Sequence, residues 1–250
     1  EKLQLNQIFG NSYSYLFYFV EAYIIAMAMD YARAALPGEE SNLRALLRFA
    51  EEEVKHQQMF VRFNELFKRQ FGSECGLAGD AHAVAKVILS KSPMGVLLVT
   101  LHLELLTQAH YIDCIKDSHE VDDLFRSLFK HHWLEEAQHA KLDVLELLKL
   151  RGKADEAQVQ QAVDDYFDIC SAFEELLGVQ AKLDVASLEL AAGRTFPESK
   201  AAAIEAAQRR GYQRAFLYCG LTNTMFQDFL SQHFPQAVDR AARLAKQLAK

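Results

Sequence analysis

The residues best suited to chemistry in this sequence are glutamates and histidines that recur at a fixed spacing. Glu53-x-x-His56 occurs in the stretch FAEEEVKHQQMF, and Glu136-x-x-His139 occurs in HHWLEEAQHA. Residues three apart lie on one face of an α-helix, so each pair can direct a carboxylate and an imidazole at the same place. Carboxylate oxygens and imidazole nitrogens are ligands of first-row transition metals. The pattern therefore indicates metal binding, and a solvated helix face rich in Glu and His is the alternative.

Two more glutamates, Glu21 and Glu104, lie among apolar neighbours, each at the same distance in sequence from the glutamate of a Glu-x-x-His pair. Glu21 and Glu53 are 32 residues apart, and so are Glu104 and Glu136. The offset from each residue of the first set (Glu21, Glu53, His56) to its counterpart (Glu104, Glu136, His139) is 83 residues. A carboxylate on a core-facing stripe is costly unless it is paired or bound to metal. Six matched residues therefore favour metal ligation over a surface role.

These ligands must be positioned by helices, because helical periodicity dominates the chain. Expected helices lie at about 11–35, 41–70, 80–90, 93–117, 120–151, 155–192, 198–232 and 235–249. Ser41 is the expected N-cap of the second helix. The midpoints of the two glutamate pairs, Pro37 and Glu120, fall in predicted turns. In two antiparallel hairpins, the ligands of both helices would thus lie at the same height, about 24 Å from the turn at about 1.5 Å per residue.

Composition agrees with an all-α protein and restricts its partners. Half of the 250 residues are hydrophobic, and only 4 prolines and 11 glycines interrupt long runs of helix-forming residues. A net charge of −7 without a clustered basic face argues against nucleic acid, and no apolar run is long enough for a membrane span. The four scattered cysteines suggest reduced thiols. We expect a cytoplasmic protein of one domain (1–250), with a four-helix bundle at 11–151 and a helical C-terminal extension packed on it at 155–250.

The ligand set over residues 11–151 resembles the ferritin-like superfamily, in its oxygen-activating di-metal branch. That resemblance implies that Glu21, Glu53 and His56 serve mainly one metal, and Glu104, Glu136 and His139 the other. Glu53 and Glu136 would be the bridging carboxylates. Two iron ions are the implied cofactors, and manganese or a mixed manganese–iron pair would use the same ligands. The resemblance further implies O2 and a small-molecule substrate. We also expect an external electron donor, since the sequence shows no flavin or nicotinamide site, and a homodimer.

The second hairpin carries a third histidine, because His132 precedes Glu136 by four residues where Phe49 stands in the first hairpin. The resulting His-x3-Glu-x2-His motif resembles the p-aminobenzoate N-oxygenase type of di-iron enzyme, which oxidises aryl amines. His132 is thus an additional ligand, a histidine that contacts a ligand without binding the metal, or a histidine of the core, while His131 is expected at the surface. Glu52 and Glu135, which precede presumed ligands, would accept the free N–H groups of His139 and His56, respectively. The alternative is plain surface charge.

Residues one turn from the ligands are candidates for a substrate pocket, and ordinary core packing is the alternative. They are Phe17, Tyr18, Phe60, Thr100, Thr107, Gln108 and Tyr111. His102, His110 and His119 fall off the ligand face and receive no role.

The resulting prediction is a di-iron oxygenase that activates O2 to oxidise a small organic substrate, by N-oxygenation of an amine or hydroxylation of a C–H bond. A ferritin-like iron-binding ferroxidase and a metal-dependent hydrolase are the alternatives. A shell-sized assembly would favour iron storage, and turnover without O2 would favour a hydrolase.

Overall fold

The structure is a computed structural model that describes residues 1–249 apart from residue 37. It is all-α, as predicted, with no strand among the described residues. No helix in this part of the chain is long and apolar enough to cross a membrane. The chain divides into two compact units, and each contains one of the two predicted ligand hairpins. The single domain and the complete four-helix bundle stay predictions.

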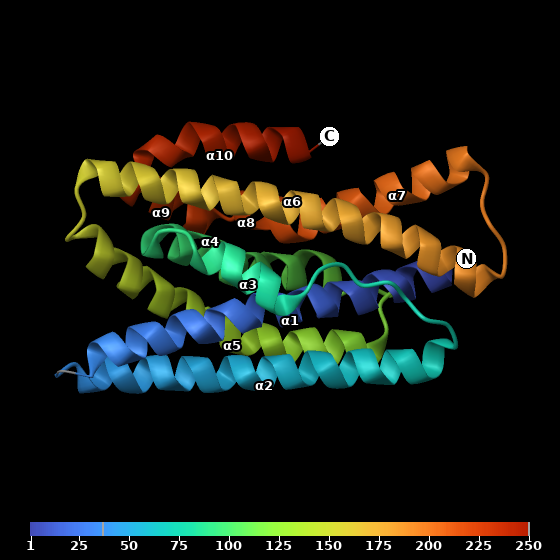
Figure 1. Ribbon diagram of the computed structural model, residues 1–250, viewed down its shortest axis with the longest axis horizontal. Helices are drawn as coiled ribbons and strands as arrows, with labels where there is room; N and C mark the ends of the chain where they lie inside the picture. Colours follow the sequence, from blue (N-terminus) through green and yellow to red (C-terminus); the bar gives the residue numbers. More distant parts are fainter. Residues whose placement is uncertain (37, 250) are drawn as a thin grey trace. The chain divides into compact units, whose positions relative to one another are not determined.

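The first unit comprises residues 1–87 and 173–212. Its helices are α1 (Lys2–Ala35), α2 (Glu40–Phe71), most of α3 (Ala81–Leu89), the second half of α6 (Glu156–Ala192) and nearly all of α7 (Glu198–Gln213). Helices α1 and α2 lie side by side as an antiparallel hairpin (Figure 1). Phe17 of α1 stacks on Phe60 of α2, with ring centroids 5.7 Å apart.

Two helix boundaries in this unit differ from the predictions. Helix α1 begins at Lys2, nine residues before the expected start, because the first turns also carry buried residues such as Ile8. The N-cap of α2 is Glu39 and not Ser41, which lies within the helix. Gly72 ends α2 in the left-handed conformation that glycine adopts without steric cost. Of the turn predicted at Pro37-Gly38, Pro37 lies outside the described residues.

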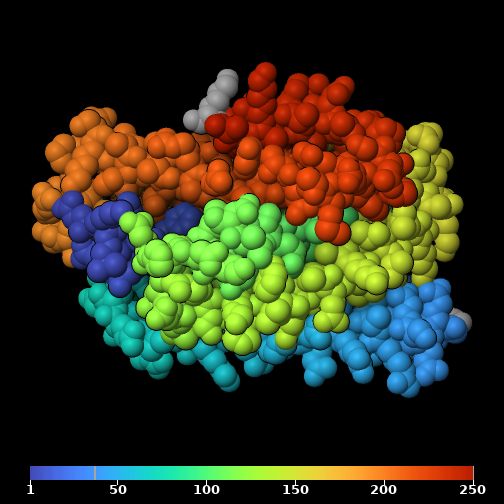
Figure 2. Space-filling view, turned by 180° about the vertical axis from the view of Figure 1, so that it is seen from behind, coloured from blue at the N-terminus to red at the C-terminus, as the bar shows by residue number. Residues whose placement is uncertain are grey.

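The second unit comprises residues 88–172 and 213–250. Its elements are α4 (Pro93–His110), the π-helix η1 (Tyr111–Ile115), α5 (Asp123–Arg151), the first half of α6, the π-helix η2 (Arg214–Tyr218), α8 (Cys219–Leu221), α9 (Thr224–His233) and α10 (Pro235–Leu248). Helices α4 and α5 form the second hairpin, and α8 and α9 pack on α4 (Figure 2). Helix α10 packs on η2, α8 and α9.

Hydrogen-bonding side chains fix the helix starts of this unit. Ser92 accepts a hydrogen bond from the Gly95 N–H, and Pro93 occupies the first turn of α4, where its missing N–H costs nothing. Asp122 caps α5 by accepting from the N–H groups of Leu124 and Phe125.

The continuous helix predicted at 198–232 is wrong. The chain passes from α7 through η2 and α8, and a new helix starts after Asn223, whose side chain accepts from the N–H groups of Met225 and Phe226. The same side chain donates to the Leu105 carbonyl, 3.1 Å away. Asn223 therefore both begins α9 and ties it to α4.

Candidate metal centre

The first unit brings together Glu21, Glu53 and His56. Glu21 stands on α1, and the other two stand one turn apart on α2. All three are buried, with exposed fractions of 2%, 0% and 0%. His56 Nδ1 lies 2.8 Å from Glu53 Oε2, and a ligand atom of Glu21 lies within 4.8 Å of one of His56. The α1–α2 hairpin thus carries two buried carboxylates and a buried imidazole near one another.

The second unit holds the corresponding set on α4 and α5. Glu104 is buried on α4, and Glu136 and His139 are buried one turn apart on α5. His139 Nδ1 lies 2.7 Å from Glu136 Oε2, which matches the contact between His56 and Glu53 in the other hairpin. The two Glu-x-x-His motifs therefore have the same local geometry, as expected for one motif on two helices.

His132 lies on the same face of α5 as this pair and is 1% exposed. Its Nε2 atom lies 2.5 Å from Glu136 Oε1. The adjacent His131 is exposed and contacts the Ser127 carbonyl through Nδ1, 2.7 Å away. Of these neighbouring histidines, only His132 is placed to share a metal ion with Glu136.

The electrostatics of Glu136 favour a charged, ligating carboxylate. Burial by itself raises the pKa of the Glu136 carboxyl. The positive charge of His132 and a hydrogen bond with Glu104 outweigh this effect and hold the pKa well below its usual range. His139 acts in the same direction. A carboxylate that stays ionised in a buried site is suited to bind a cation.

The other core histidines are held by protein groups. His102 is fully buried, with Nδ1 2.8 Å from the Tyr166 hydroxyl and Nε2 3.1 Å from the Phe216 carbonyl. Burial lowers the pKa of His102 to about 4, so the ring is neutral. Burial, reinforced by Arg214, also lowers the pKa of His110 to about 4. A neutral histidine with both nitrogens engaged fits a structural role for His102.

Glu52 and Glu135 are half-buried beside the presumed ligands. Their assignment to His139 and His56 joins residues of different units, and it stays a prediction.

The residues proposed for a substrate pocket lie in different surroundings. Thr107 donates to the Glu104 carbonyl at 2.6 Å, and Gln108 donates to the Trp133 carbonyl at 3.1 Å. The Tyr111 ring stacks on Trp133, with centroids 5.1 Å apart. Phe17, Phe60 and Thr100 are buried. Tyr18 alone lines a described cavity, which lies within the first unit.

Two acidic residues that the sequence did not single out lie on the face of α5 that carries Glu136 and His139. Asp143 and Glu146 are 1% and 6% exposed and follow His139 at helical spacing. The signal was present, because residues four apart share a face and the stripe from His132 through His139 extends to Asp143. Residues 60 and 63, at the matching positions of α2, are phenylalanines.

Compared with protein-family models, with curated proteins and with solved structures, the chain matches none. The site must therefore be interpreted from its own chemistry. Buried carboxylates and imidazoles among the described residues could hold a metal ion. Oxygen and nitrogen donors of this kind fit iron or manganese.

Proposed function

We propose that the protein is a di-iron oxygenase whose two hairpins together supply the ligands of one di-metal centre. The observation that carries the proposal is the duplication: each hairpin holds a buried Glu and a buried Glu-x-x-His pair, and the two sets are 83 residues apart throughout. That both ligand sets belong to one centre is inferred from their matched spacing from the predicted turns. The resemblance of this ligand set to oxygen-activating enzymes supports the choice of reaction.

The charge of the proposed ligands suits two divalent ions. Four glutamates carry four negative charges and would neutralise two Fe(II) ions, which makes burial of the ions tolerable. Bound iron would supply the redox chemistry with O2, and the protein would supply geometry and a site from which bulk water is excluded. His132 would add an imidazole to one ion and make the two ions inequivalent. The substrate class supported by the resemblance is a small organic molecule oxidised at an amine nitrogen or a C–H bond.

The test is to load the full-length protein with Fe(II) without oxygen, to count the bound iron, and then to mix it with O2 in a stopped-flow spectrophotometer. About two irons per chain and a discrete transient absorption band are expected from a ligand set of this size. Candidate amines and hydrocarbons can then be screened by how much they accelerate the decay of that band.

Variants of the two motif histidines provide the control. His56→Ala and His139→Ala should each lower the iron content toward one ion per chain, whereas His131→Ala should leave it at two. Many irons per chain with a smooth growth of ferric absorbance would instead indicate iron storage. Absence of iron uptake by folded wild-type protein would overturn the proposal.

A further inference from the structure

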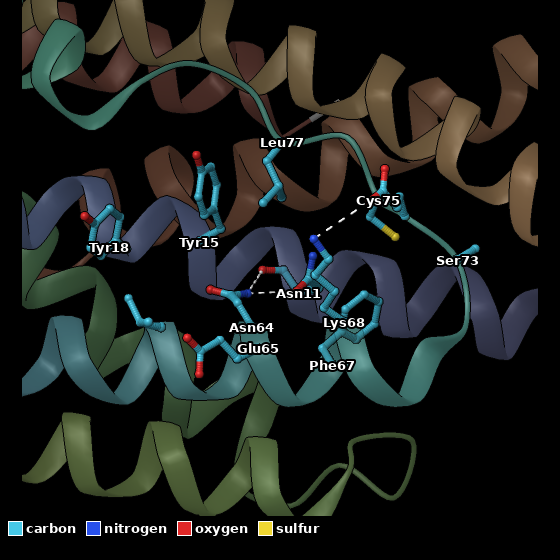
Figure 3. Close-up of a pocket in the computed structure, with 12 residues that line it drawn as sticks. Asn11, Tyr15, Tyr18, Asn64, Glu65, Phe67, Lys68, Ser73, Cys75 and Leu77 are labelled. Carbon is cyan, nitrogen blue, oxygen red and sulfur yellow. Dashed lines mark hydrogen bonds and ion pairs between the residues drawn. The ribbon is translucent and has the colours of Figure 1, made fainter.

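A cavity of about 390 Å³ lies within the first unit, between α1, α2 and the extended segment that follows α2 (Figure 3). Its aromatic lining comes from Tyr15 and Tyr18 of α1 and Phe67 of α2, and Leu77 closes it from the extended segment. Mixed apolar and polar cavities of this size are typical sites for small molecules.

The wall formed by the extended segment is fixed by side chains of α6. Ser187 accepts a hydrogen bond from the Gly76 N–H at 2.9 Å, and Gln180 Oε1 accepts from the Ala78 N–H at 2.8 Å. The Gln180 amide nitrogen donates to the Gly76 carbonyl at 3.0 Å and to the buried Asp184 carboxylate at 2.8 Å. These hydrogen bonds from α6 fix the backbone of the extended segment, so the cavity is formed before any ligand binds. A preformed cavity lowers the entropic cost of binding.

Asn64 presents an oriented acceptor in the lining. Its amide nitrogen lies 2.9 Å from the Asn11 carbonyl oxygen, 2.8 Å from the Asn11 side-chain oxygen and 2.8 Å from the Ser14 hydroxyl oxygen, so its two N–H groups are shared among three acceptors. With the nitrogen engaged, the Asn64 side-chain oxygen points away from Asn11 (Figure 3). A ligand N–H group could donate to it.

The charge of the lining favours a cation. Glu65 and Glu74 are carboxylates, and the one basic residue among the described lining, Lys68, already lies 3.8 Å from Glu74. Burial raises the pKa of the Tyr15 hydroxyl, and the neighbouring Tyr18 and Asp80 raise it further, so an anion would be unfavourable there. The rings of Tyr15 and Tyr18 have centroids 6.3 Å apart and are nearly parallel, and aromatic faces attract cations.

We propose that this cavity binds a small organic cation, an alkylammonium group carried on an apolar body. The ammonium group contacts the tyrosine faces, the Glu65 carboxylate and the Asn64 oxygen, and the apolar body packs against Phe67 and Leu77. This binding function goes beyond the proposed oxygenase and does not depend on bound metal.

The test uses three probes of equal chain length, n-hexylammonium, 1-hexanol and hexanoate, titrated into the full-length protein by isothermal calorimetry. The ammonium probe should bind about tenfold more tightly than the alcohol, since a cation–π contact and an ion pair at partly exposed sites together favour it by roughly that factor. Hexanoate should bind most weakly. Equal affinities of ammonium and alcohol would overturn the assignment of a cation.

Substituting the exposed Glu65 carboxylate tests whether the ammonium probe binds in this cavity. Glu65→Gln should weaken hexylammonium binding about three- to fivefold, as expected for one exposed ion pair, and leave 1-hexanol unchanged. Glu175→Gln removes the same charge from an exposed position on α6 outside the cavity and should change neither affinity. In a ¹⁵N-labelled sample, the Asn64 side-chain amide should shift on titration. No binding, an equal effect of both variants, or an unshifted Asn64 amide would overturn the proposal.

Discussion

Replacing His132 by alanine tests the proposed metal centre most directly, because the chain supplies its own control in the next residue. His132 is 1% exposed, and its Nε2 atom lies 2.5 Å from Glu136 Oε1. His131 is exposed and makes a local contact with the Ser127 carbonyl. Both variants remove one imidazole from adjacent positions of α5, but only His132→Ala removes one from the face that carries Glu136 and His139.

The size of the effect distinguishes two roles for His132. Loss of a residue that only orients a ligand weakens metal binding about 10- to 100-fold. Loss of a direct ligand should exceed that range, so we expect more than about 100-fold for His132→Ala, or about 2.8 kcal/mol of binding free energy. His131→Ala should stay within about twofold, because surface substitutions change little.

The assay is an anaerobic competition titration of Fe(II) between each variant and a chromophoric chelator. Circular dichroism of the metal-free proteins serves as the control, since a buried His→Ala change also leaves a small cavity. If both variants retain full helicity and bind iron equally well, the assignment of His132 as a ligand is refuted. A loss between 10- and 100-fold would make it an orienting group.

The remaining predictions concern packing, proton linkage and ligand support. Gly220→Ala should lower the free energy of unfolding by about 3 kcal/mol, because the new Cβ would lie only 2.4–2.7 Å from the buried ring of His102. Gly178→Ala should raise the free energy of unfolding by about 0.5–1 kcal/mol, because its new Cβ has no neighbour closer than 3.7 Å. Urea unfolding measures both changes. Burial raises the pKa of Asp184 above its unfolded value in spite of four hydrogen bonds. Its stabilising contribution is thus full below the unfolded pKa and is lost as pH rises through the folded one, so the stability advantage of wild type over Asp184→Asn should shrink between pH 4 and pH 7. Glu52→Ala and Glu135→Ala should weaken iron binding about tenfold without unfolding the protein, and an unchanged iron affinity would remove their role.

The sequence predicted the geometry of the two Glu-x-x-His pairs well because their signal is local and repeated. Helical spacing alone places Glu53 beside His56 and Glu136 beside His139, and both contacts are present in the structure. Buried glutamates within apolar stretches, such as Glu21, could be recognised because nothing else on such a stripe carries charge. The joining of the two hairpins into one centre rests on matched offsets alone and stays a prediction.

The features that the sequence did not predict depend on contacts between distant residues. The cavity beside α1 and α2 exists because residues 76 and 78 are held by Gln180 and Ser187, more than 100 positions later. Helical or strand periodicity cannot predict how an extended segment of this kind is held. The break before α9 is different, since Asn223 is a preferred N-cap residue and could have been read as a helix start. The π-helices η1 and η2 lie within runs of residues whose helical periodicity continues unbroken, so their altered hydrogen bonding is invisible to pattern analysis.

The two hairpins carry the same proposed ligands, but the residues next to these ligands differ between α5 and α2. Where α5 has His132, Asp143 and Glu146, the matching positions of α2 are phenylalanines at 49, 60 and 63. The α5 stripe therefore continues polar groups on either side of its Glu-x-x-His pair, whereas the α2 stripe is flanked by aromatic rings. Two metal ions held by such unequal surroundings would differ in ligand number and in charge. That inequality would support the proposed oxygenase, in which the two ions take different roles, over iron storage, in which a third histidine on one side has no use.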